Sequence, residues 1–396
     1  MIRQRMAAAR PGPAEATEVA AGTAARQVVI SIFDGPGNPY YGGGGAAVVE
    51  MIADRLAANF DVTVVSAARR RGTEVRNGVR YRRLPVAWAG PRAGQLLYHA
   101  LLPFAARRIP HDLWIESFTP PFSTSFLPLF SRARVVGLAQ NLHAQEMWDR
   151  YRLPFFLIER LGLRFYRDVV VLNPAHRALV RNCNPSASVR VIPNGIGKRR
   201  LDERLLGRGE HILYLGRIAP WEKGLDLLLA AYARSGLAMP LLVAGNGTRR
   251  EERKFGALLA ATAGDVRWVG HVSGQRKQDL LARSAFMALP SRHEAFGLAA
   301  LEGMSHGKPV LHFDLPALRW MDGDVRVPPY DVGALAGQMR DLAGDEAARR
   351  ELGQTAHAAA QRYGRDGTAD RYLTLVQELL SAPDAGPGAA GGPSCP

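Results

Sequence analysis

Short apolar segments alternate with stretches of helical periodicity through the first half of the chain. Residues 27–33 and 62–65 are apolar runs of strand length, and residues 46–59 between them repeat apolar side chains at helical spacing. A strand, a helix and a strand in this order form a βαβ unit, which implies a parallel sheet with helices on its faces. Further strands are predicted in this half at residues 113–116, 135–138, 169–172 and 189–192.

The alternation restarts after a charged, glycine-bearing segment at residues 196–209, which we predict to be an interdomain linker. Strands are predicted in the second half at residues 211–215, 240–244, 266–269, 286–289 and 310–313, with helices at 224–234, 249–261, 275–283 and 297–306. The predicted fold class is therefore α/β, with two Rossmann-like, doubly wound parallel-sheet domains at residues 27–195 and 210–364 that face a central cleft.

Both ends of the chain differ from the folded middle. Residues 365–381 predict a last amphipathic helix, which we expect to pack back toward the first domain. Residues 1–26 lack the continuous apolar stretch of a secretory signal, and residues 382–396 are rich in Gly, Pro and Ala. We expect both terminal segments to be disordered, because they contain too few apolar side chains to pack.

Composition limits the class of protein and its partners. The two cysteines, Cys183 and Cys395, favour no structural disulfide, and no apolar run has the length of a membrane-spanning helix, so we expect a cytoplasmic protein. The formal net charge of +15 favours an anionic partner such as a phosphorylated substrate or an anionic membrane surface. We expect no nucleic acid to bind, because basic motifs interleaved with aromatic residues are missing.

A glycine-rich segment at residues 42–45 separates a predicted strand from a predicted helix. Gly43 and Gly44 would leave backbone N–H groups bare at a helix N-terminus, where the macrodipole favours a phosphate or a substrate hydroxyl. A plain flexible loop explains the segment equally well.

Two cations flank one strand–loop–helix junction of the second half. Gly216-Arg217 directly follows a predicted strand, and Lys223-Gly224 precedes the next helix. Open α/β sheets bind ligands at such junctions, and a diphosphate suits an Arg that binds two oxygens beside a Lys that acts as a point charge. Taken singly, either cation is as well explained as a solvated surface residue.

The most specific pattern is the pair Glu294 and Glu302, with Phe296, Gly297 and Leu298 between them. Glu294 is expected in the loop after a strand, and Gly297-Leu298 is expected to open the helix that carries Glu302. Carboxylates suit sugar and ribose hydroxyls, and the free N–H groups at the start of a helix suit phosphate. The alternative for Glu302 is that it only solvates the helix.

In this order along the chain, these motifs resemble those of the large family of retaining GT-B glycosyltransferases, of the family 4-like or group 1 type. The resemblance spans about residues 27–380. It rests on five motifs, namely the glycine-rich loop, Val191-Ile-Pro-Asn-Gly195, Leu215-Gly-Arg217 with Lys223-Gly224, Val243-Ala-Gly-Asn-Gly247, and the Glu294–Glu302 pair. Three positions depart from the usual family pattern: Ala295 replaces glycine, Gly303 replaces alanine, and Gly197 stands where aspartate is frequent.

The resemblance implies that a hexosyl group moves from an NDP-sugar to an acceptor hydroxyl with its anomeric configuration retained. Arg217 and Lys223 would hold the donor diphosphate, and Glu294 would contact hydroxyls of the donor sugar. The other residues implied at this site are His143 near the C6 hydroxyl of the sugar, Glu302 at the ribose, Val272 at the base, and Gly43, Gly44, Gly216, Phe296, Gly297 and Leu298. No cofactor and no metal ion are expected, because the two cations can stabilise the leaving group themselves. Asp322-Gly-Asp324 is interpreted as a turn, although it matches a metal-binding motif.

The acceptor stays open between a saccharide, a lipid-linked molecule and a natural product. Residues 95–108 are apolar and end in Arg107-Arg108, which predicts either a peripheral contact with an anionic membrane or a core helix with a solvated edge. An NDP-sugar epimerase and a non-catalytic binding homologue are the alternative functions on the same fold.

Overall fold

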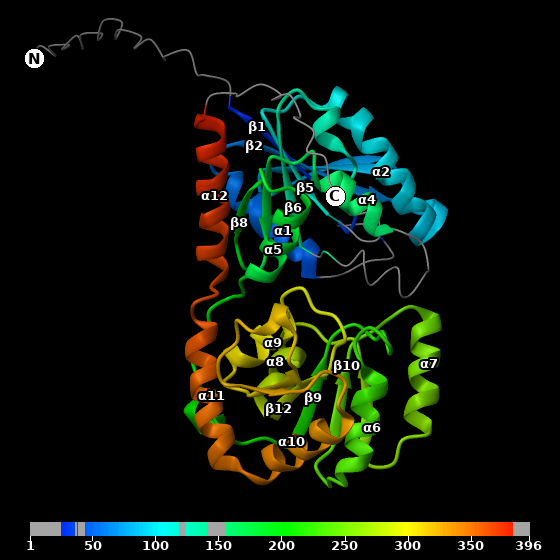
Figure 1. The fold of residues 1–396 in the computed structure, drawn as a ribbon, viewed down its shortest axis with the longest axis vertical. Helices are drawn as coiled ribbons and strands as arrows, with labels where there is room; N and C mark the ends of the chain where they lie inside the picture. The colour runs from blue at the N-terminus through cyan, green and yellow to red at the C-terminus, as the bar shows by residue number, and fades with distance from the viewer. Residues whose placement is uncertain are drawn as a thin grey trace, which may run out of the picture.

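An eight-stranded sheet forms the centre of the first domain (Figure 1). The computed structural model describes residues 25–35, 38, 44–118, 124–140, 142 and 155–382. The strand order is β3-β4-β2-β1-β5-β6-β7-β8, and every neighbouring pair is parallel except β3 with β4. The strands are β1 (Gln27–Ile32), β2 (Asp61–Ala68), β3 (Gly72–Arg76), β4 (Val79–Pro85), β5 (Leu113–Ser117), β6 (Arg134–Ala139), β7 (Asp168–Val171) and β8 (Ser188–Val191).

Helices cover both faces of this sheet. On one face, α1 packs beside α12, the last helix of the described chain, and both lie over buried strand residues such as Ile30. On the other face, α2 buries Tyr98 against Val29. The helical segments of this domain include α1 (Gly44–Leu56), η1 (Ala87–Ala89), α2 (Gly90–Arg108), η2 (Leu127–Leu129), α4 (Phe155–Leu163), α5 (Pro174–Cys183) and, from the end of the chain, α12 (Arg365–Ser381).

The hairpin β3–β4 is absent from the sequence-based prediction. Asn77 and Gly78 join its strands with φ values of 49° and 79°, which is the turn geometry that an Asn-Gly pair favours. Both strands carry exposed arginines at the edge of the sheet, so the apolar alternation that would indicate them is weak.

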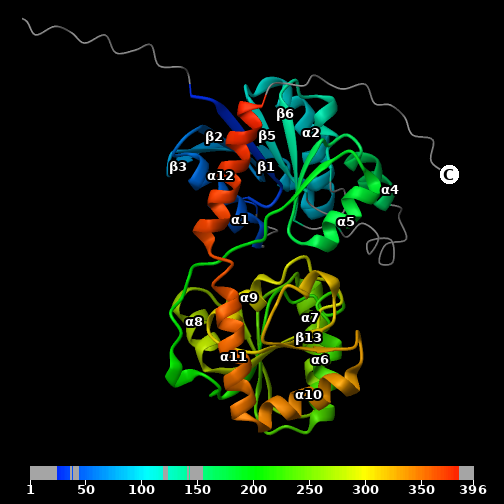
Figure 2. The same cartoon turned by 60° about the vertical axis from the view of Figure 1, so that its left-hand side comes forward.

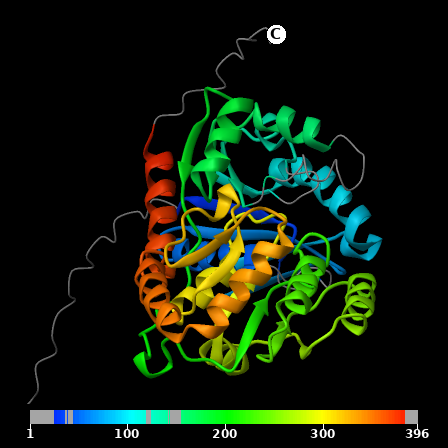
Figure 3. The same cartoon turned by 60° about the horizontal axis from the view of Figure 1, so that its bottom comes forward.

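The second domain is built on six parallel strands in the order β11-β10-β9-β12-β13-β14. Helices α6, α7 and α10 lie on one side of the sheet, and α8, α9 and α11 lie on the other (Figure 3). The strands are β9 (His211–Leu215), β10 (Leu241–Ala244), β11 (Val266–Gly270), β12 (Ser284–Leu289), β13 (Val310–Phe313) and β14 (Asp324–Val327). The helices are α6 (Leu225–Ser235), α7 (Arg249–Ala260), α8 (Gly274–Arg283), α9 (Leu298–Ser305), α10 (Val332–Gly344) and α11 (Glu346–Ala360).

These two sheets confirm the predicted pair of Rossmann-like parallel-sheet domains. One part of the prediction is wrong: it ends the second sheet at residues 310–313, whereas β14 extends the sheet by one more strand beside β13. Asp322 and Gly323 form the bend before β14, and Asp324 is its first residue.

The chain passes between the domains twice, and the two crossings lie side by side (Figure 2). Ile196 N–H donates to the carbonyl of Tyr363 at 3.0 Å, and the Ile196 carbonyl accepts from Arg365 N–H at 2.7 Å. Gly195 has no room for a side chain here, since a Cβ would lie 2.6 Å from Thr368 Oγ1. The linker and the segment before α12 are therefore held together as one connection.

After the second crossing, α12 becomes part of the first domain. Its side chains Tyr372 and Val376 are buried in the same apolar cluster as α1 and the sheet. Arg55 on α1 pairs with Asp370 at 2.6 Å. Removing α12 would therefore expose the part of this face of the first sheet that α1 does not cover.

Candidate active site

Glycines and loops at the carboxyl ends of the two sheets meet at the boundary between the domains. Gly44 opens α1 and lies against Leu298, the first residue of α9, so that a Cβ on Gly44 would come within 2.5 Å of Leu298 Cδ1. Beside this contact, Asn173 Nδ2 donates to the carbonyl of Ala295 at 2.8 Å. The structure thus brings together Gly44 and Leu298, two residues that the sequence assigns to the donor site from different domains.

Lys223 and Glu294 form an ion pair at the carboxyl edge of the second sheet. Lys223 Nζ donates to Glu294 Oε1 at 2.7 Å, and Ser291 Oγ donates to the same oxygen at 2.9 Å. The two side chains are only 18% and 16% exposed. The loops approach closely because residue 224 is a glycine with φ of 62°, whose Cβ would lie 1.8 Å from the Pro290 carbonyl oxygen.

Arg217 lies in the same loop and pairs with Glu222. Its backbone is held by Tyr214, whose hydroxyl donates to the Arg217 carbonyl at 2.8 Å. Gly216 N–H donates to the carbonyl of Ala244 at 3.0 Å, so Gly216 shapes the loop and does not have its N–H free. Gly245 makes this packing feasible, because a Cβ there would lie 1.7 Å from the Gly216 carbonyl oxygen.

Glu302 projects from α9 toward Lys277 on α8, whose Nζ lies 2.8 Å from Glu302 Oε1. A cavity of about 470 Å³ opens beside it, lined by Ile196, Gly197, Lys198, Arg199, Gln278, Leu281, Glu302, Ser305 and His306. Glu302 therefore does more than solvate its helix. Lys277 is absent from the sequence-based site, because 25 residues and an intervening strand separate it from Glu302 and no local pattern links them.

The start of α9 offers backbone donors between the two glutamates. Gly297 precedes the helix with φ of 81°, and the first N–H groups of a helix lack intrahelical partners. Phe296 is buried and stacks on Trp320 with ring centroids 4.6 Å apart, so its side chain belongs to the core and only its backbone can meet a ligand. Val272, in the loop before α8, is likewise buried.

Two predicted site residues, Gly43 and His143, lie outside the described residues.

The Asp322-Gly-Asp324 segment is engaged in contacts within the protein, since Asp324 accepts a hydrogen bond from His312 Nε2 at 2.9 Å and pairs with Arg326. One family departure has a local explanation: a Cβ on Gly303 would lie 2.1 Å from Met287 Sδ, so Met287 fills the space of the usual alanine.

Asp34 is a further polar residue of this region that the sequence-based site misses. It follows β1, and burial raises the pKa of its carboxyl to about 7, while the positive charge of Arg217 lowers it. Among the described residues, no hydrogen-bond partner reaches its buried Oδ1. Because a carboxylate after a strand is common in loops, the sequence contains no signal that distinguishes Asp34.

Known proteins resemble this chain in both halves. The family described as Glycosyltransferase Family 4 matches residues 42–200, and the family described as Glycosyl transferases group 1 matches residues 209–345. Glycogen synthase from Mycobacterium tuberculosis is 33% identical over 215 residues, which are 50% of each chain. The chain thus spans about half the length of this curated relative.

Two further proteins resemble it over longer stretches. The GDP-mannose:cellobiosyl-diphosphopolyprenol alpha-mannosyltransferase of Komagataeibacter xylinus is 29% identical over 263 residues, which are 62% of this chain and 64% of the relative. Anabaena HepE, solved in complex with UDP and glucose, matches with a TM-score of 0.69 at 16% identity, over 89% of this chain and 100% of that chain. With both family matches in chain order on two parallel-sheet domains, the protein belongs to the GT-B glycosyltransferases of the group 1 and family 4 type.

Proposed function

We propose that this protein moves a hexosyl group from an NDP-sugar to an acceptor hydroxyl and retains the anomeric configuration. The observation that carries the proposal is the Lys223–Glu294 pair, which lies in the same loops as Arg217 and the start of α9. The cations that would bind a diphosphate therefore lie beside the carboxylate that would bind sugar hydroxyls. Two of the similar proteins support a nucleotide-sugar donor, since one is named for GDP-mannose and the other was solved with UDP and glucose.

In this proposal, negative charge builds on the diphosphate as the bond to the anomeric carbon breaks. Arg217, Lys223 and the α9 N-terminus stabilise that charge without a metal ion. Glu294 accepts hydrogen bonds from hydroxyls of the donor sugar once the diphosphate takes Lys223, and Glu302 accepts from the ribose. When the donor binds, its diphosphate and hydroxyls thus replace the ion-pair partners of Arg217, Lys223 and Glu302.

A panel of UDP, GDP, dTDP and ADP in a thermal-shift assay tests the donor site. One nucleotide is expected to raise the melting temperature, because a ligand present at 100 times its Kd stabilises the native state by about 2.7 kcal/mol. Arg217→Ala should lose that shift, whereas Arg253→Ala, on the exposed side of α7, should keep it. A wild-type protein that responds to none of the four nucleotides would contradict the proposed function. NDP-sugar converted to its epimer without acceptor would favour the epimerase instead.

An apolar surface of the first domain is formed by α2, η2 and α4. We name it the α2–α4 surface, after the two helices labelled in Figure 1. Its exposed apolar residues are Leu97, Leu101, Phe104, Leu129, Leu157 and Leu161, and its exposed cations are Arg107, Arg108, Arg160 and Arg164. Contacts of the residues that flank η2 and α4 connect this region: the Arg107 guanidinium on α2 lies 5.5 Å from the Phe130 ring centroid, and the Phe126 and Phe165 rings are 6.0 Å apart. α2 therefore buries one side in the core and presents a second apolar side to solvent.

We propose that the α2–α4 surface rests on an anionic membrane and brings the protein to a lipid-linked acceptor. Exposed apolar side chains accompanied by exposed arginines suit the interfacial region of a bilayer. The similar mannosyltransferase is named for an acceptor on diphosphopolyprenol. Within the described residues, no helix has the length and apolar character needed to span a membrane.

Flotation with phosphatidylglycerol–phosphatidylcholine vesicles tests this surface. Arg107→Ala with Arg108→Ala should weaken binding by about 30-fold, since each cation near an anionic surface contributes about 1 kcal/mol. The matched control is Arg249→Ala with Arg250→Ala on α7 of the second domain, which should bind like the wild type. No flotation of the wild type at low salt, or equal flotation of both double variants, would contradict the membrane contact.

A further inference from the structure

Trp320 holds the backbone that precedes α9. Its indole N–H donates to the Phe296 carbonyl at 2.9 Å, and its ring stacks on the Phe296 ring with an angle of 6° between the planes. The Phe296 side chain is buried, so the core encloses one side of the stacked pair. Trp320 therefore fixes both the side chain and the carbonyl of a residue assigned to the donor site.

The hydrogen bond to this carbonyl also determines where the next N–H points. The Phe296 carbonyl and the Gly297 N–H belong to one planar trans peptide group, in which the two bonds point in opposite directions. Gly297 then turns the chain into α9 with φ of 81°, and the first N–H groups of a helix have no intrahelical partners. The N–H groups assigned to the donor are thus oriented by an indole that lies 24 residues farther along the chain.

A second contact holds the peptide group before this one. Asn173, which precedes α5 in the first domain, donates from Nδ2 to the Ala295 carbonyl at 2.8 Å. Its Oδ1 accepts from His176 N–H at 2.8 Å, which fixes the orientation of the Asn173 side chain. We name residues 294–298 the donor loop. Successive carbonyls of the donor loop are therefore held by different domains, Ala295 by the first and Phe296 by the second.

Trp320 also contacts the segment that crosses between the domains. The Tyr363 ring packs edge-on against the Trp320 ring with centroids 4.6 Å apart, and its centroid lies 5.8 Å from that of Phe296. The Tyr363 carbonyl accepts from Ile196 N–H in the paired crossings. A continuous series of contacts therefore runs from the crossings through Tyr363 and Trp320 to the donor loop.

We propose that Trp320 is a positioning residue for the donor: it orients the peptide groups of the donor loop toward the donor diphosphate and links their position to the interdomain crossings. The assignment rests on the proposed glycosyl transfer, which brings the diphosphate to the start of α9. Packing alone needs only the ring of Trp320, whereas orienting the peptide group between Phe296 and Gly297 needs its indole N–H. Tyr363 acts through Trp320, whose ring it contacts more closely than that of Phe296.

Isothermal titration calorimetry with two nucleotides tests this role, and no acceptor needs to be identified. The nucleoside diphosphate carries the phosphate that would lie at the donor loop, and the monophosphate of the same base lacks it. Trp320→Phe keeps an aromatic ring and removes the N–H. It should weaken diphosphate binding by about 10-fold, as expected when a hydrogen bond to a charged group is lost, and leave monophosphate binding within twofold.

The matched control is Trp114→Phe in the first domain. Trp114 also donates its indole N–H, to Ser31 Oγ at 2.9 Å, and its side chain is fully buried in the core. This variant should melt at a lower temperature and bind both nucleotides like the wild type. A Trp320→Phe variant that binds the diphosphate like the wild type, or that loses affinity for both nucleotides equally, overturns the positioning role.

A double-mutant cycle tests the link to the crossings. Tyr363→Leu should weaken diphosphate binding by about threefold, since one aromatic contact is lost, whereas Tyr363→Phe should bind like the wild type. Combining Tyr363→Leu with Trp320→Phe should cause no loss beyond that of Trp320→Phe, because Tyr363 acts through the indole N–H. Losses that multiply in the double variant would overturn the link between the crossings and the donor loop.

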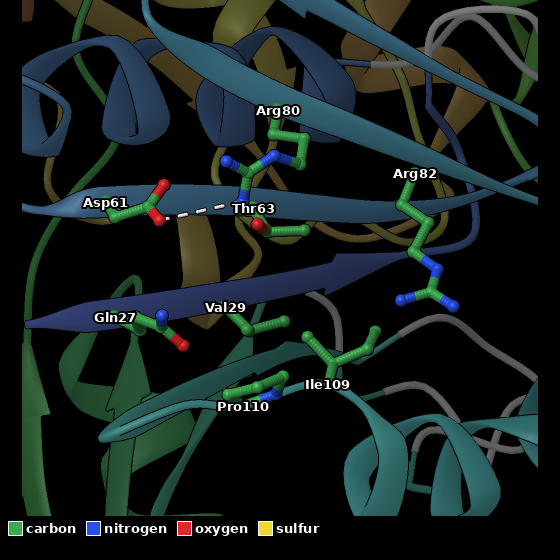
Figure 4. Close-up of a pocket in the computed structure, with 8 residues that line it drawn as sticks. All are labelled: Gln27, Val29, Asp61, Thr63, Arg80, Arg82, Ile109 and Pro110. Carbon is green, nitrogen blue, oxygen red and sulfur yellow. Dashed lines mark ion pairs between the residues drawn. The ribbon is translucent and has the colours of Figure 1, made fainter.

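Arg80 and Arg82 offer a phosphate an alternative place to bind. Both line a cavity of about 200 Å³ at the amino ends of β1 and β2, where Arg80 pairs with Asp61 at 3.6 Å (Figure 4). The donor site lies instead at the carboxyl ends of the strands, so Arg82→Ala should bind both nucleotides like the wild type. A loss of diphosphate affinity in Arg82→Ala would place the nucleotide in this cavity and overturn the role of Trp320.

The outcomes separate the inference from the function on which it rests. Diphosphate binding by the wild type that is unchanged in Trp320→Phe overturns the role of Trp320 alone. A wild type that binds none of the four nucleoside diphosphates overturns the glycosyl transfer, and the role of Trp320 with it.

Discussion

Replacing Lys223 by methionine is expected to lower kcat for donor turnover by about 10²–10³-fold. Methionine keeps the length of the side chain but removes the charge that stabilises the departing diphosphate in a partly buried site, where such a group has a large effect. The measurement is nucleoside diphosphate release at saturating donor, with Lys254→Met on the exposed side of α7 as the control.

The same substitution leaves Glu294 without its cation, so a loss of stability must be separated from a loss of catalysis. Adding Glu294→Gln to Lys223→Met should recover part of the melting temperature, because the unpaired carboxylate is removed. It should not recover turnover. A double variant that regains wild-type turnover would show that Lys223 acts only by holding the fold.

Replacing Tyr372 by alanine is expected to destabilise the first domain by about 3–5 kcal/mol, the usual cost of truncating a buried aromatic side chain. Tyr372 is 1% exposed between α12 and the first sheet. Its hydroxyl has no hydrogen-bond partner among the described residues, and burial raises its pKa well above the usual range. Tyr372→Phe should therefore match or exceed wild-type stability, since it removes an unsatisfied polar atom and keeps the ring.

Urea unfolding followed by circular dichroism compares the two variants. Equal losses for Tyr372→Ala and Tyr372→Phe would mean that the hydroxyl has a partner in solution. No loss for Tyr372→Ala would mean that α12 does not belong to the core of the first domain.

The central strands were predictable because a strand buried on both faces is a continuous apolar run. β13 starts and ends at the predicted residues, and β12 at residues 284–289 contains the predicted 286–289. The edge strands β3 and β14 escaped prediction for the opposite reason, whereas the edge strands β8 and β11 were predicted. β3 carries polar residues on both sides, and β14 alternates charged residues with valines, so neither has an apolar run to recognise.

The proximity of candidate site residues was predictable where the topology of a parallel sheet decides it. Arg217, Lys223 and Glu294 all follow strands at the carboxyl edge, and neighbouring strands bring those ends together. Lys277 and Asp34 depend on contacts between elements that are distant in sequence. The buried Lys308 is similar: its Nζ donates to the carbonyls of Leu205 and Arg208 in the linker, and burial lowers its pKa to about 8, although a lysine is normally predicted to be exposed.

We expect the paired crossings at Ile196 and Tyr363–Arg365 to act as the hinge between the two domains. Because hydrogen bonds hold the two crossing segments together, we expect any rotation of one domain against the other to have its axis at these segments. The displacement of an element grows with its distance from this axis, so α2 and α7, on the side away from the crossings, are expected to move more than the elements beside the crossings (Figure 1). A covalent tether placed on the side away from the crossings would stop the motion, whereas one placed along the crossings would leave it free.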